Sequence, residues 1–219
     1  MLKKFLAALP SRWQEELKKW RFASQIKNSK FVTDEPEYDI LPELVSSGDW
    51  VLDVGANVGH YTCRFSELVG AGGRVLAFEP IPPTFCLLSA NTRLFKFGNV
   101  SLFNMAVSDK LDVLGMSVPK FDSGLNNYYQ AHVTDDTEAD FSILTFPIDN
   151  LDIEQKVTLV KIDAEGHEES VLEGMSSLIN RHHPTLIIET VSEQTDAKLR
   201  GLGYKPEKLR GSPNTLYKY

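Results

Sequence analysis

Two groups of residues in this chain combine polar side chains with glycines in an order that suits ligand binding or catalysis. In the first, the apolar run at residues 51–54 carries Asp53 and leads into Gly55, Asn57 and Gly59. Glycine permits a tight strand-to-helix turn, and the start of a helix presents unpaired N–H groups. A carboxylate at this turn repels a diphosphate but accepts a hydrogen bond from a cationic amino group. The pattern therefore favours a small ligand that carries a positive charge.

A second acidic residue follows the next apolar run. Residues 75–80 read Val-Leu-Ala-Phe-Glu-Pro, which predicts a strand that ends at Glu79, where a carboxylate can bind both hydroxyls of a ribose. The dinucleotide fingerprint needs glycines where this chain has Asn57 and His60. Together the two motifs predict a site for S-adenosylmethionine (SAM) rather than NAD. A nucleotide-dependent oxidoreductase stays an alternative, because it would use the same kind of sheet.

The second group lies at residues 161–168, where a mostly apolar run ends in four titratable side chains around a glycine. Ligands of open α/β sheets bind at the carboxyl ends of the strands. We expect Asp163 to face the reacting centre and Glu165 and His167 to line the following turn, where each could accept a proton. Glu168 also suits the first turn of a helix, because the helix dipole favours acids there. A noncatalytic SAM-binding module, the second alternative, would lack this group.

Composition places the chain among ordinary soluble domains. It has 219 residues and a net charge of −7, which argues against nonspecific binding of nucleic acid. Cys63 and Cys86 show no metal-ligand spacing, and we expect both to be buried, reduced thiols. The apolar run before Pro10 is too short for an export signal. We therefore predict a cytoplasmic protein, either a monomer or a homodimer.

From residue 38 onward, strand-like and helix-like segments alternate. Strands are predicted at 50–54, 74–78, 100–104, 157–162 and 184–189, and helices at 38–46, 58–69, 83–96 and 168–179. This alternation predicts an α/β fold with a doubly wound, mostly parallel sheet. Residues 204–209 and 215–219 predict a C-terminal antiparallel hairpin, the usual ending of the SAM-methyltransferase architecture.

The N-terminal segment is predicted to be separate from this domain. Residues 1–36 are predicted to form an amphipathic helix and its lead-in, and residues 37–219 to form the SAM-dependent domain. Apolar side chains at helical intervals between residues 2 and 20, ending in Trp13, Leu17 and Trp20, form a stripe. We expect this stripe to dock on the domain. A membrane-surface contact or a dimer contact is the alternative, because Trp and Lys on one amphipathic segment suit either.

An insertion at about residues 109–150 interrupts the alternation. Segments 116–118 and 142–148 predict an extra hairpin, whereas the residues between them are polar and loop-like. Long loops inside compact domains are usually functional or disordered. We expect residues 115–140 to form a mobile wall beside a small-molecule or glycan acceptor, with Tyr128 and Tyr129 stacking on it.

The motifs, taken in order, resemble those of the FkbM family of SAM-dependent methyltransferases. The matching segments are residues 51–62, 78–80, 104–109, 161–168 and 184–189, and the resemblance spans roughly residues 38–190. It implies a class I methyltransferase (Rossmann-like) fold and O-methylation of a hydroxyl on a sugar or natural-product-like acceptor. It also implies SAM contacts for Asp53, Gly55, Asn57 and Glu79, an adenine wall at Ala106, and a substrate-side loop over residues 163–168.

The complete predicted site follows from these segments. The predicted cofactor-binding residues are Asp53, Gly55, Ala56, Asn57, Gly59, Glu79, Pro80, Ala106 and Asp163. The predicted catalytic residues are Asp163, Glu165 and His167. No metal site is predicted, although Asp163 and Glu189 occupy sheet positions similar to the metal-binding acids of magnesium-dependent catechol-type O-methyltransferases.

Overall fold

A seven-stranded sheet forms the centre of the protein. The computed structural model describes residues 10–119, 121, 132–134, 139–189 and 191–219. The strand order is β10-β11-β9-β8-β1-β2-β3. The strands are β1 (Trp50–Val54), β2 (Arg74–Phe78), β3 (Val100–Phe103), β8 (Val157–Ile162), β9 (Thr185–Ile188), β10 (Lys205–Lys208) and β11 (Thr215–Lys218). All neighbours pair in parallel except β11, which is antiparallel to β9 and β10. The predicted sheet and terminal hairpin are confirmed.

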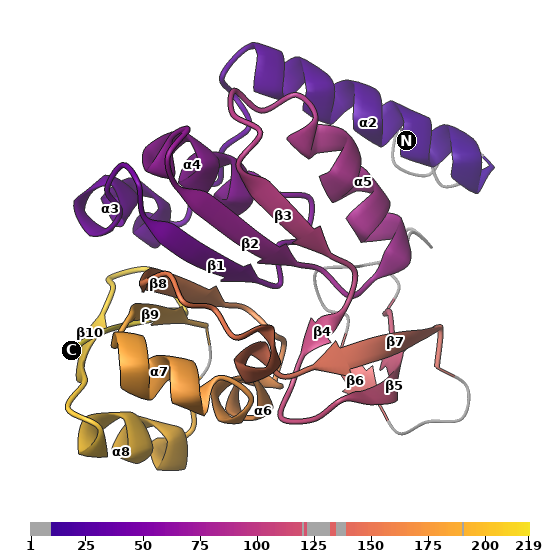
Figure 1. Cartoon of the computed structure of the whole chain (residues 1–219). Helices are drawn as coiled ribbons and strands as arrows, with labels where there is room; N and C mark the ends of the chain where they lie inside the picture. Colours follow the sequence, from indigo (N-terminus) through magenta and orange to yellow (C-terminus); the bar gives the residue numbers. More distant parts are fainter. Residues whose placement is uncertain (1–9, 120, 122–131, 135–138, 190) are drawn as a thin grey trace.

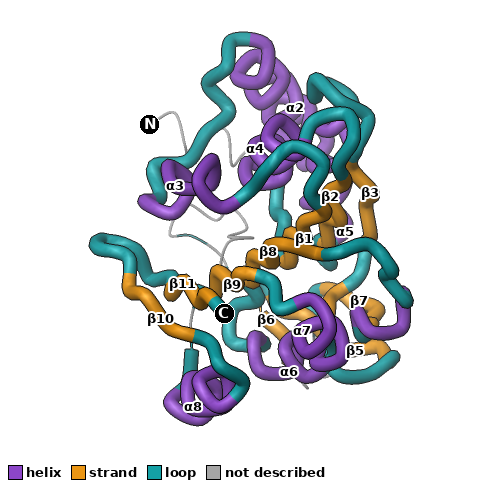
Figure 2. The backbone as a smooth tube through the Cα atoms, turned by 60° about the vertical axis from the view of Figure 1, so that its left-hand side comes forward, coloured by secondary structure: helices purple, strands orange, loops and turns teal. Residues whose placement is uncertain are grey.

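Helices cover both faces of this sheet. They are α2 (Ser11–Lys27), α3 (Pro36–Leu44), α4 (His60–Val69), α5 (Pro82–Thr92), α6 (Glu168–Glu173), α7 (Ser176–His182) and α8 (Glu193–Gly201). Figure 2 shows the strands as a band between α3 and α4 on one side and α6 to α8 on the other. Because side chains alternate along a strand, Val51 and Leu159 pack under α3 and α4, whereas Leu52 and Val160 pack under α6 and α7.

The C-terminal half contains two features that the sequence pattern did not predict. The predicted helix at 168–179 is divided into α6 and α7 at Gly174, where an added Cβ would lie 1.9 Å from the Ser108 carbonyl oxygen. Helix α8 was missed because its sequence is largely polar, with only Thr195 and Leu199 buried. Its start is fixed by Ser192, whose side chain accepts a hydrogen bond from the Thr195 N–H.

The insertion builds a second, four-stranded sheet, visible beside the main sheet in Figure 1. Its strands are β4 (Ala106–Val107), β5 (Asp112–Ser117), β6 (His132–Thr134) and β7 (Phe141–Phe146), with a 3₁₀ turn following at Ile148–Leu151. The predicted hairpin is the antiparallel β5/β7 pair. Strands β4 and β6 have two and three residues, too few for a sequence pattern. Tyr128 and Tyr129 lie outside the described residues, so the mobile wall stays a prediction.

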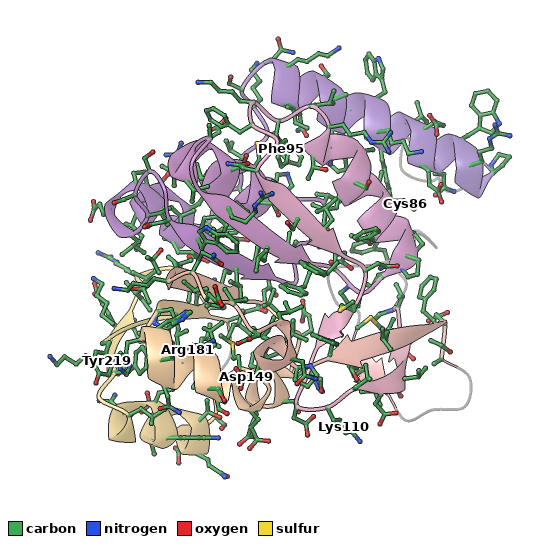
Figure 3. All side chains as sticks on the ribbon, in the orientation of Figure 1. Cys86, Phe95, Lys110, Asp149, Arg181 and Tyr219 are labelled. Carbon is green, nitrogen blue, oxygen red and sulfur yellow. The ribbon has the colours of Figure 1, made fainter. Side chains whose placement is uncertain are left out.

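Helix α2 docks by a different face from the predicted one. Figure 1 shows it along the outer side of α5, away from the sheet. Phe22 is buried in a cluster with Phe31 and with residues of α4 and α5, and Phe95, labelled in Figure 3, packs against that cluster. Trp13, Leu17 and Trp20 are instead 64%, 44% and 74% exposed. Docking through the apolar stripe is therefore wrong for these residues, because the aromatic cluster holds the opposite face. Residues 1–9 of the predicted helix lie outside the described part.

The two cysteines have different environments. Both are free thiols, and Cys63 is buried as predicted. Cys86 is exposed on α5, where Figure 3 labels it. The prediction of a buried thiol is wrong for Cys86, because α5 turns Thr84, Leu87, Leu88 and Asn91 inward instead.

The docking of α2 can be tested by comparing its two faces. We expect Phe22→Ala to lower the free energy of unfolding by about 3 kcal/mol, because the variant leaves a cavity among buried aromatic rings. Trp20→Ala removes a larger side chain that is 74% exposed, so it should change that free energy by less than about 0.5 kcal/mol. Urea denaturation followed by circular dichroism measures both. Equal destabilisation by the two variants would contradict this placement of α2.

Candidate active site

A cavity of about 230 Å³ opens where β1, β2, β8 and β9 end. The cavity is lined by carboxylates of Glu35, Glu79, Asp163, Glu165 and Glu189, and by apolar side chains that include Phe78, Ile81, Met105, Ala106, Met116 and Val133. None of the described lining residues is a lysine or an arginine. Such a lining attracts a cationic ligand and repels a diphosphate, and its apolar part suits a flat base.

The structure brings most of the predicted site residues to this cavity. Those that line it are Gly55, Asn57, Glu79, Pro80, Ala106, Asp163, Glu165 and His167. Asp53, Ala56 and Gly59 are not among the residues that line the cavity. Their predicted roles in binding the cofactor stay predictions. Glu35 and the apolar residues of the small sheet were not predicted.

The glycine turn fits closely against the end of β8. Gly55 has a φ of +77°, and an added Cβ there would lie 1.9 Å from the Asp163 carbonyl oxygen. Gly59 has a φ of +99° and packs against Leu88 of α5, where a Cβ would lie 2.7 Å from Cδ1. The N–H groups of Gly55 and Ala56 both donate to the Phe78 carbonyl oxygen. These N–H groups therefore fix the turn to β2. Both residues precede α4, so these bonds do not test the expectation of unpaired N–H groups at the start of the helix.

Glu79 joins the loops that follow β1 and β2. One carboxylate oxygen accepts from the Asn57 N–H and the other from the Ile81 N–H, each at 2.9 Å. The side chain is 4% exposed. Burial raises the pKa of Glu79 to about 7, although the two backbone N–H groups oppose that shift. Each oxygen keeps a further lone pair for a ligand hydroxyl.

A buried cation lies beneath the glycine turn. Lys161 and Asp53 are neighbours across β8 and β1, on the sheet face that α4 covers. The Lys161 ammonium is 2.8 Å from an Asp163 carboxylate oxygen and 4.6 Å from the centre of the Tyr61 ring. Burial disfavours this ammonium, but Asp163 and Asp53 outweigh burial and raise the pKa of Lys161. Lys161 thus stays charged and offsets the two acids.

Asp53 is fully buried beside this cation. Its Oδ2 accepts from the Thr62 hydroxyl at 2.5 Å, and its Oδ1 has no hydrogen-bond partner among the described residues. Burial raises the pKa of Asp53, and Lys161 and Thr62 oppose that shift. An unpaired carboxylate oxygen at this depth is costly, and a bound ammonium or a water molecule near the turn would relieve the cost.

Asp163, Glu165 and Glu189 form an acidic cluster in the lining of the cavity. Oxygens from the three side chains lie within 4.8 Å of one another, close enough to hold a metal ion. Burial opposes ionisation of Asp163, but Lys161 and a hydrogen bond with Glu189 outweigh it and lower the pKa of Asp163. Burial and the same hydrogen bond raise the pKa of Glu189 to about 8. Near neutral pH, therefore, Glu189 is protonated and donates to ionised Asp163.

His167 is held at the edge of the cavity by Ser108. The Ser108 hydroxyl lies 2.9 Å from His167 Nε2 and donates to an Asp109 carboxylate oxygen at 3.0 Å. With the hydroxyl proton directed at Asp109, Nε2 carries the ring proton and Nδ1 is left as the acceptor. Burial lowers the pKa of His167, with Asp109 and Glu168 opposing the shift. The ring is therefore neutral at pH 7 and able to take up a proton.

Glu35 is the residue that sequence reasoning missed most clearly. It precedes Pro36 at the start of α3, yet it lines the cavity. The Tyr61 hydroxyl donates to its Oε2 at 2.5 Å. No strand or glycine motif surrounds Glu35, so only the packing of α3 against α4 identifies it as part of the site.

The strand order, the glycine turn and an acidic cavity at the carboxyl ends of the strands define a class I SAM-dependent methyltransferase. Residues 53–206 match the model of the methyltransferase FkbM domain, and the chain belongs to that family. The resemblance noted from the motifs is confirmed, and the oxidoreductase alternative is excluded. The cofactor of this domain is SAM.

Three relatives are similar to this chain in sequence or in fold. Hexuronic acid methyltransferase AglP from Haloferax volcanii is 30% identical over 144 residues, which cover 64% of this chain and 55% of AglP. A methyltransferase FkbM structure from Methylobacillus flagellatus has a TM-score of 0.55 at 17% identity and covers 94% of this chain and 59% of its own. A putative rRNA-methylase from Clostridium thermocellum has a TM-score of 0.51 at 13% identity, covering 85% and 95% of the two chains. The chain thus spans little more than half of the first two relatives.

Glu79 gives a prediction for cofactor binding. A ribose hydroxyl donates more strongly to an ionised carboxylate, so the affinity for S-adenosylhomocysteine should rise as the pH increases through about 7, where Glu79 ionises. Glu79→Gln should weaken binding by about tenfold or more and flatten this part of the pH profile. Calorimetry from pH 5 to pH 9 measures both effects. The exposed Glu154→Gln is the control, and an unchanged pH profile in Glu79→Gln would refute the assignment.

Lys161 gives a prediction for stability. Lys161→Met leaves Asp53 and Asp163 without their buried counter-charge, which should lower the free energy of unfolding by about 3–5 kcal/mol. Without the cation the pKa of each acid rises above its unfolded value, so the folded state binds more protons and the deficit should be larger at pH 8 than at pH 5.

Urea denaturation at both pH values tests this prediction. Adding Asp53→Asn to Lys161→Met should restore part of the lost stability, whereas the exposed Lys156→Met should have little effect. A deficit that is the same at both pH values would show that Lys161 acts through packing alone.

Proposed function

We propose that this protein transfers the methyl group of SAM to a hydroxyl of a sugar or natural-product-like acceptor. The observation that carries the proposal is that Glu79 and Asn57 line the same cavity as Glu165 and His167. Glu79 and Asn57 suit the nucleoside of the cofactor, and Glu165 and His167 suit an acceptor that loses a proton. The name of AglP, a hexuronic acid methyltransferase, supports a sugar acceptor.

The roles of the residues follow from their charges. SAM supplies an electrophilic methyl group on a good leaving group, so the main task of the protein is alignment and exclusion of water. Glu35 and ionised Asp163 make the cavity favourable for a sulfonium and an ammonium. Met116 and Val133 of the small sheet line the same cavity and would shape the acceptor side.

The proton acceptor is assigned to His167 or Glu165 rather than Asp163. Asp163 is a weakened base, because Lys161 and Glu189 hold its pKa low. Burial, with Asp163 and Glu168, raises the pKa of Glu165, which makes it a stronger base than an ordinary carboxylate. His167 is neutral at pH 7 with Nδ1 open as an acceptor. Asp163 then orders the charges around the reacting atoms.

We propose that residues 37–219 form the methyltransferase domain and that the acceptor is not a nucleic acid, in keeping with the net charge of −7. A cytoplasmic location and a monomeric or homodimeric state stay predictions from the sequence.

Radiolabelled SAM with a panel of hexuronic acid glycans, neutral glycans and hydroxylated small molecules tests the proposed activity. We expect label on glycans, and a 10²- to 10⁴-fold loss of kcat in His167→Gln or Glu165→Gln, as is typical of a lost general base. Affinity for S-adenosylhomocysteine should change little in these variants. The exposed Glu169→Gln is the matched control.

Two outcomes would contradict parts of this proposal. Cofactor binding without transfer to any member of the panel would favour the noncatalytic module. Loss of turnover with a chelator, restored by magnesium, would assign Asp163, Glu165 and Glu189 to a metal site instead.

A further inference from the structure

The outer face of α2 is apolar at its centre and basic at its ends. Trp13, Leu17 and Trp20 are spaced by four and three residues, so they lie on one side of the helix, and all three are exposed. Arg12 and Arg21 are exposed beside the two tryptophans. Glu16 lies on the same face, but its carboxylate is paired with Lys19 at 2.8 Å. Large apolar side chains grouped on a protein surface mark an interaction site.

Charge is distributed very unevenly along the chain. Residues 1–30 contain eight lysines and arginines and two acids, a net charge of +6, in a chain whose total is −7. The remaining residues therefore carry −13. The segment next to α2 in space is also basic, because residues 80–108, which include α5, contain Arg93 and Lys96 and no acid. The exposed tryptophans thus lie in the basic part of an otherwise acidic protein.

We propose that this face of α2 binds the surface of an anionic lipid bilayer. A basic amphipathic helix with Trp and Leu on its exposed face lies in the plane of the membrane interface, where indole rings are favoured and Arg or Lys binds anionic headgroups. None of the described helices is long and apolar enough to span a bilayer. The opposite face of α2 stays docked through Phe22.

Charge makes a bilayer a better occupant than a second copy of the chain. A two-fold pairing of this face would bring Arg12 and Arg21 of one copy against those of the other, with like charges in contact. Residues 1–9 add Lys3 and Lys4 and no acid, so they increase the positive charge instead of neutralising it. An anionic bilayer satisfies both the apolar centre and the basic ends of the face.

Vesicle sedimentation with the full chain tests the proposal. We expect binding to vesicles of phosphatidylcholine mixed with phosphatidylglycerol, little binding to phosphatidylcholine alone, and release by sodium chloride. The Trp13→Ala/Trp20→Ala variant should bind at least tenfold more weakly, because two aromatic side chains lose their burial in lipid. The Arg12→Gln/Arg21→Gln variant should also lose roughly tenfold.

A matched control and a spectroscopic readout accompany the sedimentation. Leu111→Ser/Val113→Ser removes side chains that are 63% and 62% exposed beside and on β5, and it should bind like the parent. Tryptophan fluorescence should shift to the blue on mixed vesicles in the parent and not in Trp13→Ala/Trp20→Ala, which keeps only Trp50.

Several results would overturn the proposal without bearing on methyl transfer. Failure of the full chain to bind mixed vesicles is one, and equal loss in the Leu111→Ser/Val113→Ser control is another. A dimer by light scattering that Trp13→Ala/Trp20→Ala dissociates would assign the face to a second copy. Vesicle binding that appears only after deletion of residues 1–9 would show that the chain covers its own helix.

Discussion

One buried ammonium, that of Lys161, makes the carboxyl edge of the central sheet possible. Asp53 on β1 and Asp163 after β8 are brought together because Gly55 packs directly against the Asp163 backbone. Two desolvated carboxylates at such a junction would repel each other, and the cation between them removes that cost. The Lys161 ammonium also influences Glu189. It keeps Asp163 charged, so Glu189 retains its proton and donates a hydrogen bond to Asp163. Lys161 thus affects the pKa of Asp163 directly and the protonation of Glu189 through Asp163.

The loops after β1 and β2 are joined by the Glu79 carboxylate instead of presenting free backbone donors. Glycine turns of dinucleotide-binding folds hold a diphosphate with backbone N–H groups. Here the N–H groups of Gly55 and Ala56 bond to Phe78, and that of Asn57 bonds to Glu79. Glu79 therefore fixes the turn and presents acceptors to the cavity at the same time. This arrangement favours a cationic nucleoside over a dinucleotide.

The sequence predicts what depends on local pattern. Strands β1, β2 and β8 have the predicted bounds, because continuous apolar runs with polar ends are a strong signal. Predictions of cavity position succeed for residues at the ends of those strands, such as Glu79 and Asp163. The unpredicted features depend on contacts between distant segments: β4 pairs with β7, β6 pairs with β5, and Glu35 is bonded by Tyr61 of α4. The docking face of α2 was assigned wrongly because apolar periodicity does not say which side meets a partner.

The segment before the glycine turn links helix α2 to the residues that line the cavity. Phe22 of α2 packs edge-to-face on Phe31, with 5.6 Å between ring centroids, and Phe31 packs on His60 at the start of α4. Four residues after Phe31, Glu35 bonds to Tyr61 of the same helix and lines the cavity. The ring contacts of α2 and the hydrogen bond of Glu35 therefore converge on the same helix, α4. Close packing of these rings makes α2 part of the aromatic cluster around the start of α4 and not a detached segment.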